Sequence, residues 1–395
     1  MNGEVFDPVL FRKHFPGLDN LAYLACCSLP PASARLGEAM AAMLAAMSAP
    51  RLAWERFEAE VERLRVQTAA LIGARADQVA LLPDATTSAF QVASTLRWAR
   101  QPRLVTSSAE FPGLAHVWLA QRPRGAQVVF VGDRDGTVCA EDYLAAIDAR
   151  TGLVSVPMTT YRHGIRLPVA QIAAAAHDAG ACVVTDAYQA TGVEPVDVAA
   201  LDVDYLITGY GKYLLGLPGI AALYVRQRAD GSLWPQLTGW LGRRNPFAFD
   251  PHELDFPLDA GRLQLGTPAI PAIYAANAGL SLIGELDLAV VRQHVLSLTE
   301  GIVATLTAQG HRSVPQPDPA TRGAHVALPH PDPGALSAFL TERNVLISPR
   351  GEVARLSVHA FSTRLDVLAA CALIEQFDGS ARPRRLSAQA GARHA

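Results

Sequence analysis

Seven short apolar runs follow one another between residues 78 and 225, most of them separated by longer segments with helical patterning. The runs occupy residues 78–83, 103–108, 127–132, 153–158, 181–186, 204–209 and 220–225. Most are nearly continuous in Val, Ile and Leu, as expected for strands that are buried on both faces. Strands that alternate with helices in this way predict an α/β fold, with a mostly parallel seven-stranded sheet and helices on both of its faces.

Helical patterning is also found outside the strand runs. Residues 33–47 and 51–72 are expected to form two helices before the sheet. Residues 167–180 are expected to form a helix between two of the strand runs, in which Pro168 fits the first turn and Gly180 fits the C-terminal cap. These punctuating residues support the helical interpretation of the segments between strands.

The pattern changes after the last strand run. Residues 232–262 are rich in Pro, Gly and Trp and lack periodicity, which predicts a long functional loop. Helices are expected near 270–284 and 287–309, followed by strand and helix signals up to about residue 377. The chain is therefore expected to contain an N-terminal segment (1–25), a large domain (26–262), a small α+β C-terminal domain (263–378) and a disordered tail (379–395).

Composition narrows the class of protein. The 395 residues suit one large and one smaller domain, and half of them are hydrophobic while 18% are charged, as in a globular protein. A net charge of −3 with scattered arginines argues against a nucleic-acid partner. No apolar run reaches the length of a membrane span and no signal peptide is recognisable, so a cytoplasmic protein without a membrane partner is expected. The five cysteines include no C-x-x-C pair, which favours reduced thiols.

Lysine is almost absent from the chain. Among 34 Lys and Arg residues, only Lys13 and Lys212 are lysines. Arginine cannot lose its proton in a protein, whereas an amine can deprotonate and attack a carbonyl. Lys13 lies in a charge-flanked stretch and is interpreted as a chance survivor of a bias towards arginine. Lys212 lies between an apolar run and the glycine-rich segment that follows it, so its surroundings must decide its role.

Reactive side chains follow two neighbouring strand runs. Asp186 ends one run, Gln189 lies three residues later, and Lys212 follows the next run. Ligands bind at the carboxyl ends of the strands in open parallel sheets. A carboxylate and a lone amine at that edge suit pyridoxal phosphate, because the lysine can form a Schiff base and the aspartate can keep the ring nitrogen protonated. Taken alone, Asp186 is better explained as a helix N-cap.

Such a site also requires a group of hydrogen-bond donors that binds the cofactor phosphate. The segment PDATTSAF follows a strand and opens a helix, so Thr86 and Thr87 could present amides and hydroxyls to an anion. Plain capping by Asp84 explains the same segment equally well. Thr208 and Tyr210 lie close enough to Lys212 in the sequence to donate additional hydrogen bonds.

Three more residues are candidates for ring and substrate contacts. Phe111 follows a strand end and could stack on a cofactor ring, although a single aromatic residue more often belongs to the core. Arg355 lies on a strand-like run and could bind a substrate carboxylate with its forked donor, although a surface salt bridge is the commoner role. Thr267 lies in a Gly-Thr-Pro turn, which alone indicates an ordinary loop.

Together these motifs occur in the order found in a known family. The matching segments are YLACCSLPP, PDATTSAF, SAEFPG, VVTDAYQATGVEPVD, GYGKYLLGLPGIAALYV, TGW, RLQLGTPAIPA and SPRGEVARLSVHAFST. From about Tyr23 to Phe377 the chain resembles the class V aminotransferases of the fold-type I pyridoxal phosphate enzymes. That group includes cysteine desulfurases, kynureninases and isopenicillin N epimerase-like proteins. The resemblance implies a large cofactor domain, a small C-terminal domain and a homodimer with shared active sites.

The resemblance also implies roles at matched positions, with no metal. The implied cofactor contacts are Lys212 as the Schiff-base lysine, Asp186 at the ring nitrogen, Gln189 near the ring oxygen, Phe111 stacked on the ring, Thr86 and Thr87 at the phosphate, Trp240 on the phosphate side and Thr267 at the phosphate of the partner subunit. Arg355 matches the arginine that binds the substrate α-carboxylate. These assignments extend the interpretation reached from the residues themselves.

Several positions depart from the family pattern. Gly211 precedes the lysine where His or Tyr is common, and Ala25-Cys26-Cys27 replaces a usual Asp-Asn-Ala. Tyr161 replaces a frequent Asn, with His163 two residues later. Such positions contact substrate or the ring oxygen in relatives. Tyr161 and His163 are therefore expected to bind substrate, and the substrate is expected to be unusual.

The expected function is an enzyme that forms an external aldimine with an amino acid, of the lyase (β- or γ-elimination) or aminotransferase type, in specialised metabolism. An amino-acid epimerase of the same family is an alternative. Residues 310–352 contain no cysteine, which argues against persulfide chemistry of the cysteine desulfurase kind. A nucleotide-binding protein is disfavoured because Tyr213 follows Lys212 where a P-loop requires Ser or Thr. A non-catalytic binding protein is disfavoured because the lysine, aspartate and arginine are all retained.

Overall fold

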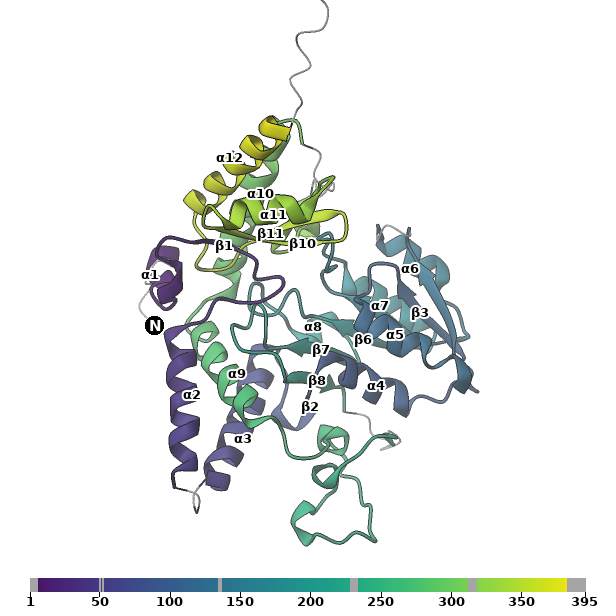
Figure 1. Ribbon diagram of the computed structural model, residues 1–395. Coiled ribbons are helices and arrows are strands. Elements are labelled where there is room, and N and C mark those ends of the chain that lie inside the picture. Colours follow the sequence, from purple (N-terminus) through teal and green to yellow (C-terminus); the bar gives the residue numbers. More distant parts are fainter. Residues whose placement is uncertain are drawn as a thin grey trace, which may run out of the picture.

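A seven-stranded sheet forms the centre of the larger part of the molecule (Figure 1). The computed structural model describes residues 6–49, 51, 53–133, 137–227, 234–311 and 318–381. The strands are β2 (Val79–Leu82), β3 (Arg103–Ser107), β4 (Gln127–Val131), β5 (Thr151–Pro157), β6 (Cys182–Asp186), β7 (Tyr205–Gly209) and β8 (Ala221–Val225), in the spatial order β2-β8-β7-β6-β5-β3-β4. Only β8 is antiparallel to its neighbours, so the prediction of a mostly parallel sheet is confirmed.

Both faces of this sheet are buried except along the edge strand β4, which explains the continuous apolar runs. In β2, Val79 and Leu81 belong to one core cluster and Ala80 and Leu82 to the other. Helices α6 (Ala140–Ala146) and α7 (Val169–Asp178) pack on the first face, and α4 (Ala85–Thr95) and α5 (Pro112–Leu119) belong to the cluster on the second. Covered on both sides, a strand has no position where a polar side chain could reach water.

The local signals for α7 agree with the structure. Pro168 is the residue just before the helix, and Gly180, just beyond its end, adopts a positive φ of 78°. Glycine suits this position because it has no Cβ to oppose the left-handed conformation that closes a helix. The short connection that follows returns the chain directly to β6.

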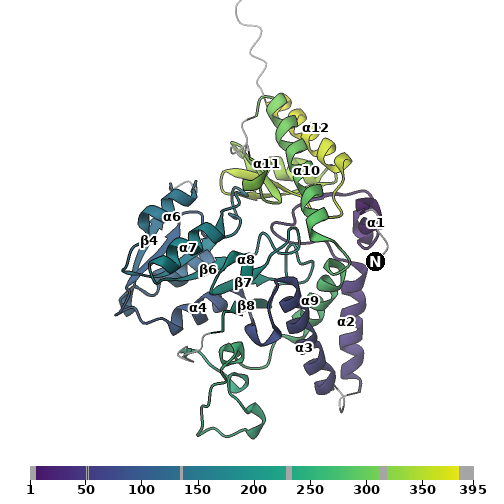
Figure 2. The ribbon, with the colours of Figure 1, turned by 180° about the vertical axis from the view of Figure 1, so that it is seen from behind.

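A second, four-stranded sheet lies beside the first, at the top of Figure 1 and from behind in Figure 2. Its order is β1 (Ala22–Leu24), β10 (Val345–Arg350), β11 (Val353–Ser357) and β9 (His325–Pro329), with α10 (Leu288–Ala308), α11 (Pro333–Thr341) and α12 (Arg364–Ala381) packed around it. Strand β1 runs parallel to β10. The N-terminal segment is thus part of the same sheet as residues near the other end of the chain.

Three helices form a bundle at the side of the large sheet: α2 (Ala34–Met47), α3 (Ala53–Leu71) and α9 (Ile270–Ile283). Helix α9 packs tightly against the segment that follows Lys212. A Cβ at Gly279 would lie only 2.1 Å from the carbonyl oxygen of Leu214, so glycine is required there. Two shorter helices, α1 (Pro8–Arg12) and α8 (Val198–Leu201), complete the α-helices of the described residues.

The predicted long loop is largely irregular where the structure describes it. Residues 234–262 contain short 3₁₀ turns, and the segment projects from the body of the molecule at the bottom of Figure 1. In the described ranges no single helix is long and apolar enough to cross a membrane. The division into 1–25, 26–262, 263–378 and 379–395 stays a proposal. Helix α12 reaches Ala381, and residues 382–395 of the expected tail lie outside the described residues.

Candidate active site

The carboxyl edge of the large sheet holds a cavity of about 190 Å³. Strand β6 ends at Asp186, and Lys212 follows the end of β7 by three residues. The cavity brings five of the expected site residues together and is lined by Ala85, Ala109, Phe111, Leu114, Pro157, Thr159, Tyr161, Asp186, Tyr188, Gln189 and Lys212. Parallel neighbouring strands explain the meeting, because their carboxyl ends share one edge.

Lys212 presents its amine to two aromatic rings. Nζ lies 5.5 Å from the ring centre of Phe111 and 4.3 Å from that of Tyr188. Burial lowers the pKa of Lys212 to about 8, while the charge of Asp186 acts in the opposite direction. A substantial fraction of this amine is therefore neutral and nucleophilic near physiological pH.

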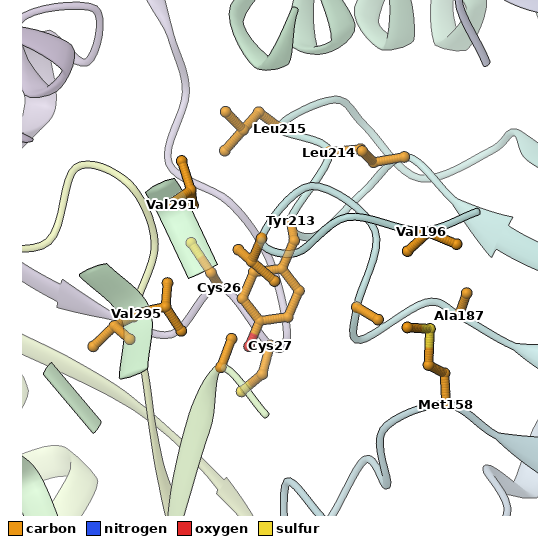
Figure 3. Close-up of a cluster of buried hydrophobic side chains, with 14 of the residues drawn as sticks. Cys26, Cys27, Met158, Ala187, Val196, Tyr213, Leu214, Leu215, Val291 and Val295 are labelled. Carbon is orange, nitrogen blue, oxygen red and sulfur yellow. The ribbon is translucent and has the colours of Figure 1, made fainter. Parts of the chain in front are cut away.

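The residue after the lysine anchors it in the core. Tyr213 is 1% exposed, and Figure 3 shows its ring beside Cys26 and Cys27, in the turn that follows β1. The Tyr213 carbonyl also accepts a 2.9 Å hydrogen bond from His359 Nε2. A buried aromatic residue next to the lysine fixes the backbone from which the amine extends.

Asp186 and Gln189 are buried on the wall beside the amine. Asp186 Oδ1 accepts a 2.9 Å hydrogen bond from the backbone N–H of Tyr188, and burial raises the pKa of this carboxyl while Lys212 opposes the rise. Gln189 Nε2 donates to the carbonyl of Cys27 at 3.1 Å. Gln189 Oε1 meets no partner among the described residues, so this side of the cavity retains unused hydrogen-bonding capacity.

The segment expected to bind the phosphate forms the first turn of α4. Asp84 is the N-cap, and its Oδ1 accepts a 2.6 Å hydrogen bond from the Thr87 backbone N–H. The capping interpretation of this segment is therefore correct, but it does not close the site. Thr86 is exposed, and first-turn amides lack intrahelical partners. Ala85, the first residue of the helix, lines the cavity.

The hydroxyl groups of Thr208 and Tyr210 do not face the cavity. The Thr208 hydroxyl lies 2.5 Å from that of Thr191, and the Tyr210 hydroxyl lies 2.5 Å from that of Thr68 on α3. Neither residue lines the cavity. Their sequence proximity to Lys212 was the basis of the expectation, and the structure directs both hydroxyls into the packing around β7 instead.

Arg355 reaches the site from the small sheet. It is 1% exposed, and its guanidinium donates to Ser348 O at 3.2 Å, Ser348 Oγ at 2.7 Å and Tyr161 O at 2.7 Å. Tyr161 lines the cavity, and its ring lies 5.2 Å from that of Phe111. His163 is buried close to these residues but is not part of the cavity wall.

Trp240 and Thr267 lie together in a cavity whose lining does not include Lys212. Both line a second cavity of about 400 Å³, next to Trp54, Phe57 and other residues of α3. Trp240 also stacks on Phe249 with ring centres 5.8 Å apart. Neither residue lines the cavity that contains Lys212.

The sequence interpretation missed three residues near the site. Tyr188 lines the cavity, and His325 on β9 is fully buried close to Arg355, Lys212 and His163. Glu110 is buried next to Phe111, and its Oε2 accepts a 2.6 Å hydrogen bond from the Ser155 hydroxyl. Each of these residues lies within a strand or a recognised motif, and none occurs at a sequence spacing that would mark it as a site residue.

The residues present fit pyridoxal phosphate. A partly neutral amine, a buried carboxylate, two aromatic faces and the first turn of α4 meet at one cavity. The buried Gln189 Oε1 has no hydrogen-bond partner among the described residues and is free to accept one from a ligand. These are the groups needed to hold an aldehyde, a pyridine ring and a phosphate.

Comparisons with known proteins agree with this geometry. The class V aminotransferase family profile matches residues 38–367. The uncharacterised aminotransferase YcbU of Bacillus subtilis is 31% identical over 357 residues, covering 90% of this chain and 94% of that protein. The kynureninase of Deinococcus radiodurans is 29% identical over 245 residues, covering 61% of this chain and 58% of that enzyme.

Solved structures share the fold at lower identity. The apo structure of a cysteine desulfurase from Thermococcus onnurineus has a TM-score of 0.83 at 20% identity, covering 94% of this chain and 98% of that one. A variant of C-DES, solved with glycine covalently linked to its pyridoxal phosphate, has a TM-score of 0.84 at 20% identity, covering 92% and 98%. Fold and site thus define a fold-type I enzyme. The chain belongs to the class V aminotransferase family, whose members are dependent on pyridoxal phosphate.

Proposed function

We propose that this protein binds pyridoxal phosphate through Lys212 and acts on a free amino acid, as a lyase or an aminotransferase. The observation that carries the proposal is the placement of the Lys212 amine, in one cavity with Asp186 and Gln189 at the carboxyl edge of the sheet. Family membership supports it independently. The two lines of support use different information, since the cavity is defined by geometry and the family by sequence.

The proposed cofactor-holding residues line the cavity or belong to the first turn of α4 beside it. Asp186 would keep the ring nitrogen protonated, Gln189 would face the ring oxygen, and Phe111 would cover the ring. Thr86 and Thr87 would offer the first turn of α4 to the phosphate. When bound, pyridoxal phosphate supplies an electron sink for the bonds at the substrate Cα.

Lys212 would move the proton at the substrate Cα. Because burial brings its pKa to about 8, the amine can accept a proton and release it again at neutral pH. Arg355 would hold the α-carboxylate, and its hydrogen bond to the Tyr161 carbonyl ties it to the cavity wall. Tyr161 and His163 would then contact the remainder of the substrate and exclude water from it.

Elimination and transamination both begin with removal of that proton. Epimerisation requires in addition that a proton returns to the opposite side of Cα, and the cavity contains Tyr161 as a hydroxyl-bearing residue besides Tyr188 and Thr159. A persulfide-transfer reaction of the cysteine desulfurase kind lacks its cysteine between residues 310 and 352. Cys371 lies in α12, where burial raises its pKa to about 11 and keeps the thiol protonated.

A homodimer is part of the proposal. The cavity that contains Trp240 and Thr267 is bordered by exposed aromatic residues, among them Trp54 and Phe247. In a dimer, these residues would be covered, and Thr267 would reach the phosphate of the partner subunit. The proposed dimer would account for two residues that are expected at the cofactor but do not line the cavity of their own Lys212.

The assignment of Lys212 can be tested directly because the chain contains only two lysines. Wild type, Lys212→Ala and the matched control Lys13→Ala are incubated with pyridoxal phosphate and recorded between 300 and 500 nm, roughly the range of the cofactor. Borohydride reduction and peptide mass spectrometry then locate the label. The expected result is a visible band and a label on Lys212 in wild type and in the Lys13 variant, with neither in Lys212→Ala. A wild-type protein without a visible absorption band after incubation would contradict the proposal.

A binding protein without turnover is the remaining alternative from a different class. A panel of amino acids, assayed for keto acid, ammonia and exchange of the Cα proton with deuterated water, separates it from an enzyme. Keto acid without ammonia indicates transamination, both together indicate elimination, and exchange with loss of optical purity indicates epimerisation. A holoprotein that gives none of these signals with any amino acid would favour the binding protein.

A further inference from the structure

Tyr188 gives the cavity a second aromatic face. It lies two residues after Asp186, and Lys212 Nζ lies 4.3 Å from its ring centre. The same amine lies 5.5 Å from the ring centre of Phe111, whose own ring contact is with Tyr161. The amine therefore contacts two aromatic rings, and both rings belong to the cavity wall.

The Tyr188 ring is held rigidly by the neighbouring strand. A Cβ at Gly209, the last residue of β7, would lie 2.3 Å from both Cζ and the hydroxyl oxygen of Tyr188. No side chain fits at that distance, so the ring rests directly on the backbone of Gly209. Because β7 is a central strand of the sheet, the ring is supported by one of the most rigid parts of the fold.

The hydroxyl of Tyr188 lies against Gly209 at the end of β7, and Ala85 in the first turn of α4 lines the same cavity as Tyr188. The backbone of Gly211 hydrogen-bonds to this hydroxyl, and the carboxylate of Asp84, the N-cap of α4, is close enough to affect its ionisation. Burial, the larger cause, and the charge of Asp186 raise the pKa of Tyr188 to about 12. The hydroxyl is therefore protonated at neutral pH and can donate a hydrogen bond.

Glycine occupies two of the three positions before Lys212. Gly209 and Gly211 have no side chain to offer a ligand. The Tyr188 hydroxyl lies against Gly209 and comes from the segment just after the neighbouring strand β6. We propose that Tyr188 is a cofactor-binding residue: its ring covers a face of the pyridine, and its hydroxyl donates a hydrogen bond to the phosphate. The inference rests on the proposed function, since it requires that pyridoxal phosphate binds.

The two roles separate in a comparison of ligands. Apparent Kd values for pyridoxal phosphate and for pyridoxal, which lacks the phosphate, are measured by equilibrium dialysis. Tyr188→Phe keeps the ring, so it should weaken pyridoxal phosphate about tenfold, the effect of one hydrogen bond to a charged group, and leave pyridoxal unchanged. Tyr188→Ala should weaken both ligands. Tyr224→Phe, which removes a hydroxyl on β8 outside the cavity, is the matched control and should weaken neither.

A size exchange tests the packing without measuring activity. Gly209→Ala forces the Tyr188 ring away from the backbone, because its Cβ would lie 2.3 Å from the ring. The bound cofactor should then show a weaker circular dichroism signal in the visible range, since its ring is less rigidly held. Adding Tyr188→Ala to Gly209→Ala relieves the clash, so the double variant should bind pyridoxal phosphate no more weakly than Tyr188→Ala alone. A double variant with the two losses multiplied would contradict the packing argument.

Failure of this inference differs from failure of the proposed function. A wild type that binds no pyridoxal phosphate would overturn both. A wild type that binds it, with Tyr188→Phe and Tyr188→Ala equal to wild type for both ligands, would overturn the role of Tyr188 alone. Equal weakening of both ligands by Tyr188→Phe would overturn the assignment of the hydroxyl to the phosphate.

Discussion

Arg355 Nη1 donates a 2.7 Å hydrogen bond to the carbonyl oxygen of Tyr161, and this bond joins the small sheet to the wall of the cavity. Arg355 belongs to β11, whereas Tyr161 lies in the loop after β5 of the large sheet. A nearby backbone bond, from Gly323 N–H to Gly164 O at 2.8 Å, connects the same two regions. The proposed substrate contact is thus built where the two sheets of the chain meet.

Arg355→Lys should abolish most of the activity while leaving cofactor binding intact. A lysine cannot replace the three bonds that the guanidinium makes to Ser348 and Tyr161, and it presents a point charge instead of a fork. With the best amino acid of the panel, kcat/KM should fall about a hundredfold or more, as for the loss of a buried charged pair. The visible band should persist. Arg343→Lys, at an exposed position just after α11, is the control. Loss of the visible band in Arg355→Lys would indicate a structural role.

The rate at which apoprotein captures pyridoxal phosphate should rise with pH up to about 8. Burial places the pKa of Lys212 near 8, and only the neutral amine attacks the aldehyde. Below that pH the rate should fall about tenfold for each unit, because the neutral fraction falls by that factor. In Asp186→Asn, the carboxylate that favours the charged amine is absent, so the midpoint should move to lower pH. Stopped-flow absorbance measures both profiles; a midpoint near 10 in wild type would contradict the buried amine.

Glu110→Gln should stabilise the protein at alkaline pH and change little at acidic pH. Burial, and secondarily the charge of Asp186, raises the pKa of Glu110 from its ordinary value of 4.5 to about 7. The folded state therefore holds this proton more tightly than the unfolded state, and stability falls as pH rises from about 4.5 to 7. The loss is on the order of 3 kcal/mol above pH 7.

Thermal or urea unfolding at pH 5 and pH 8 checks this prediction on the apoprotein. The stability difference between Glu110→Gln and wild type should grow with pH, because glutamine cannot ionise. Glu342→Gln, at an exposed position, should show no such dependence. If Glu110→Gln is less stable than wild type at both values, then the hydrogen bonds from Ser155 and the Phe111 backbone outweigh the cost of the buried charge.

Most of the large sheet could be predicted from the sequence because its strands are buried on both faces, so each appears as a continuous apolar run. Strand β1 was not predicted, because its three residues pair only with β10, near the other end of the chain. Lys212, Asp186 and Gln189 could be found because strand ends converge at one edge. Tyr188 could not, since its position depends on the missing side chain of Gly209 in the next strand, a relation that no local pattern contains.

The sequence distance to Lys212 was a poor guide for hydroxyl groups. Thr208 and Tyr210 are its close neighbours in sequence, yet their hydroxyls pair with Thr191 and Thr68. Thr208 lies on β7, where side chains alternate in direction, and Tyr210 follows the end of β7 but is buried against α3. Asp186, the last residue of β6, and Phe111, beyond the end of β3, both line the cavity.

Subunit exchange should regenerate cofactor sites from two deficient chains. A homodimer should first be seen at twice the chain mass of 42.1 kDa by analytical ultracentrifugation. Lys212→Ala lacks the amine, and a Trp240→Ala, Thr267→Ala chain lacks the residues proposed to complete the partner's phosphate site. In a hybrid dimer, one site contains the intact Lys212 of one chain with the intact Trp240 and Thr267 of the other. Random mixing should therefore restore about a quarter of the sites of a C₂ dimer.

The measurement is the visible absorbance at limiting pyridoxal phosphate, after the two variants are mixed under conditions that allow exchange and then returned to buffer. Mixing each variant with itself is the control and should restore nothing. A band that recovers only in the mixture requires that Thr267 or Trp240 acts across the subunit boundary. If the doubly substituted chain binds cofactor as well as wild type by itself, then the cavity around Trp240 and Thr267 has no part in the cofactor site, and the reason for their separation from Lys212 must be sought in packing alone.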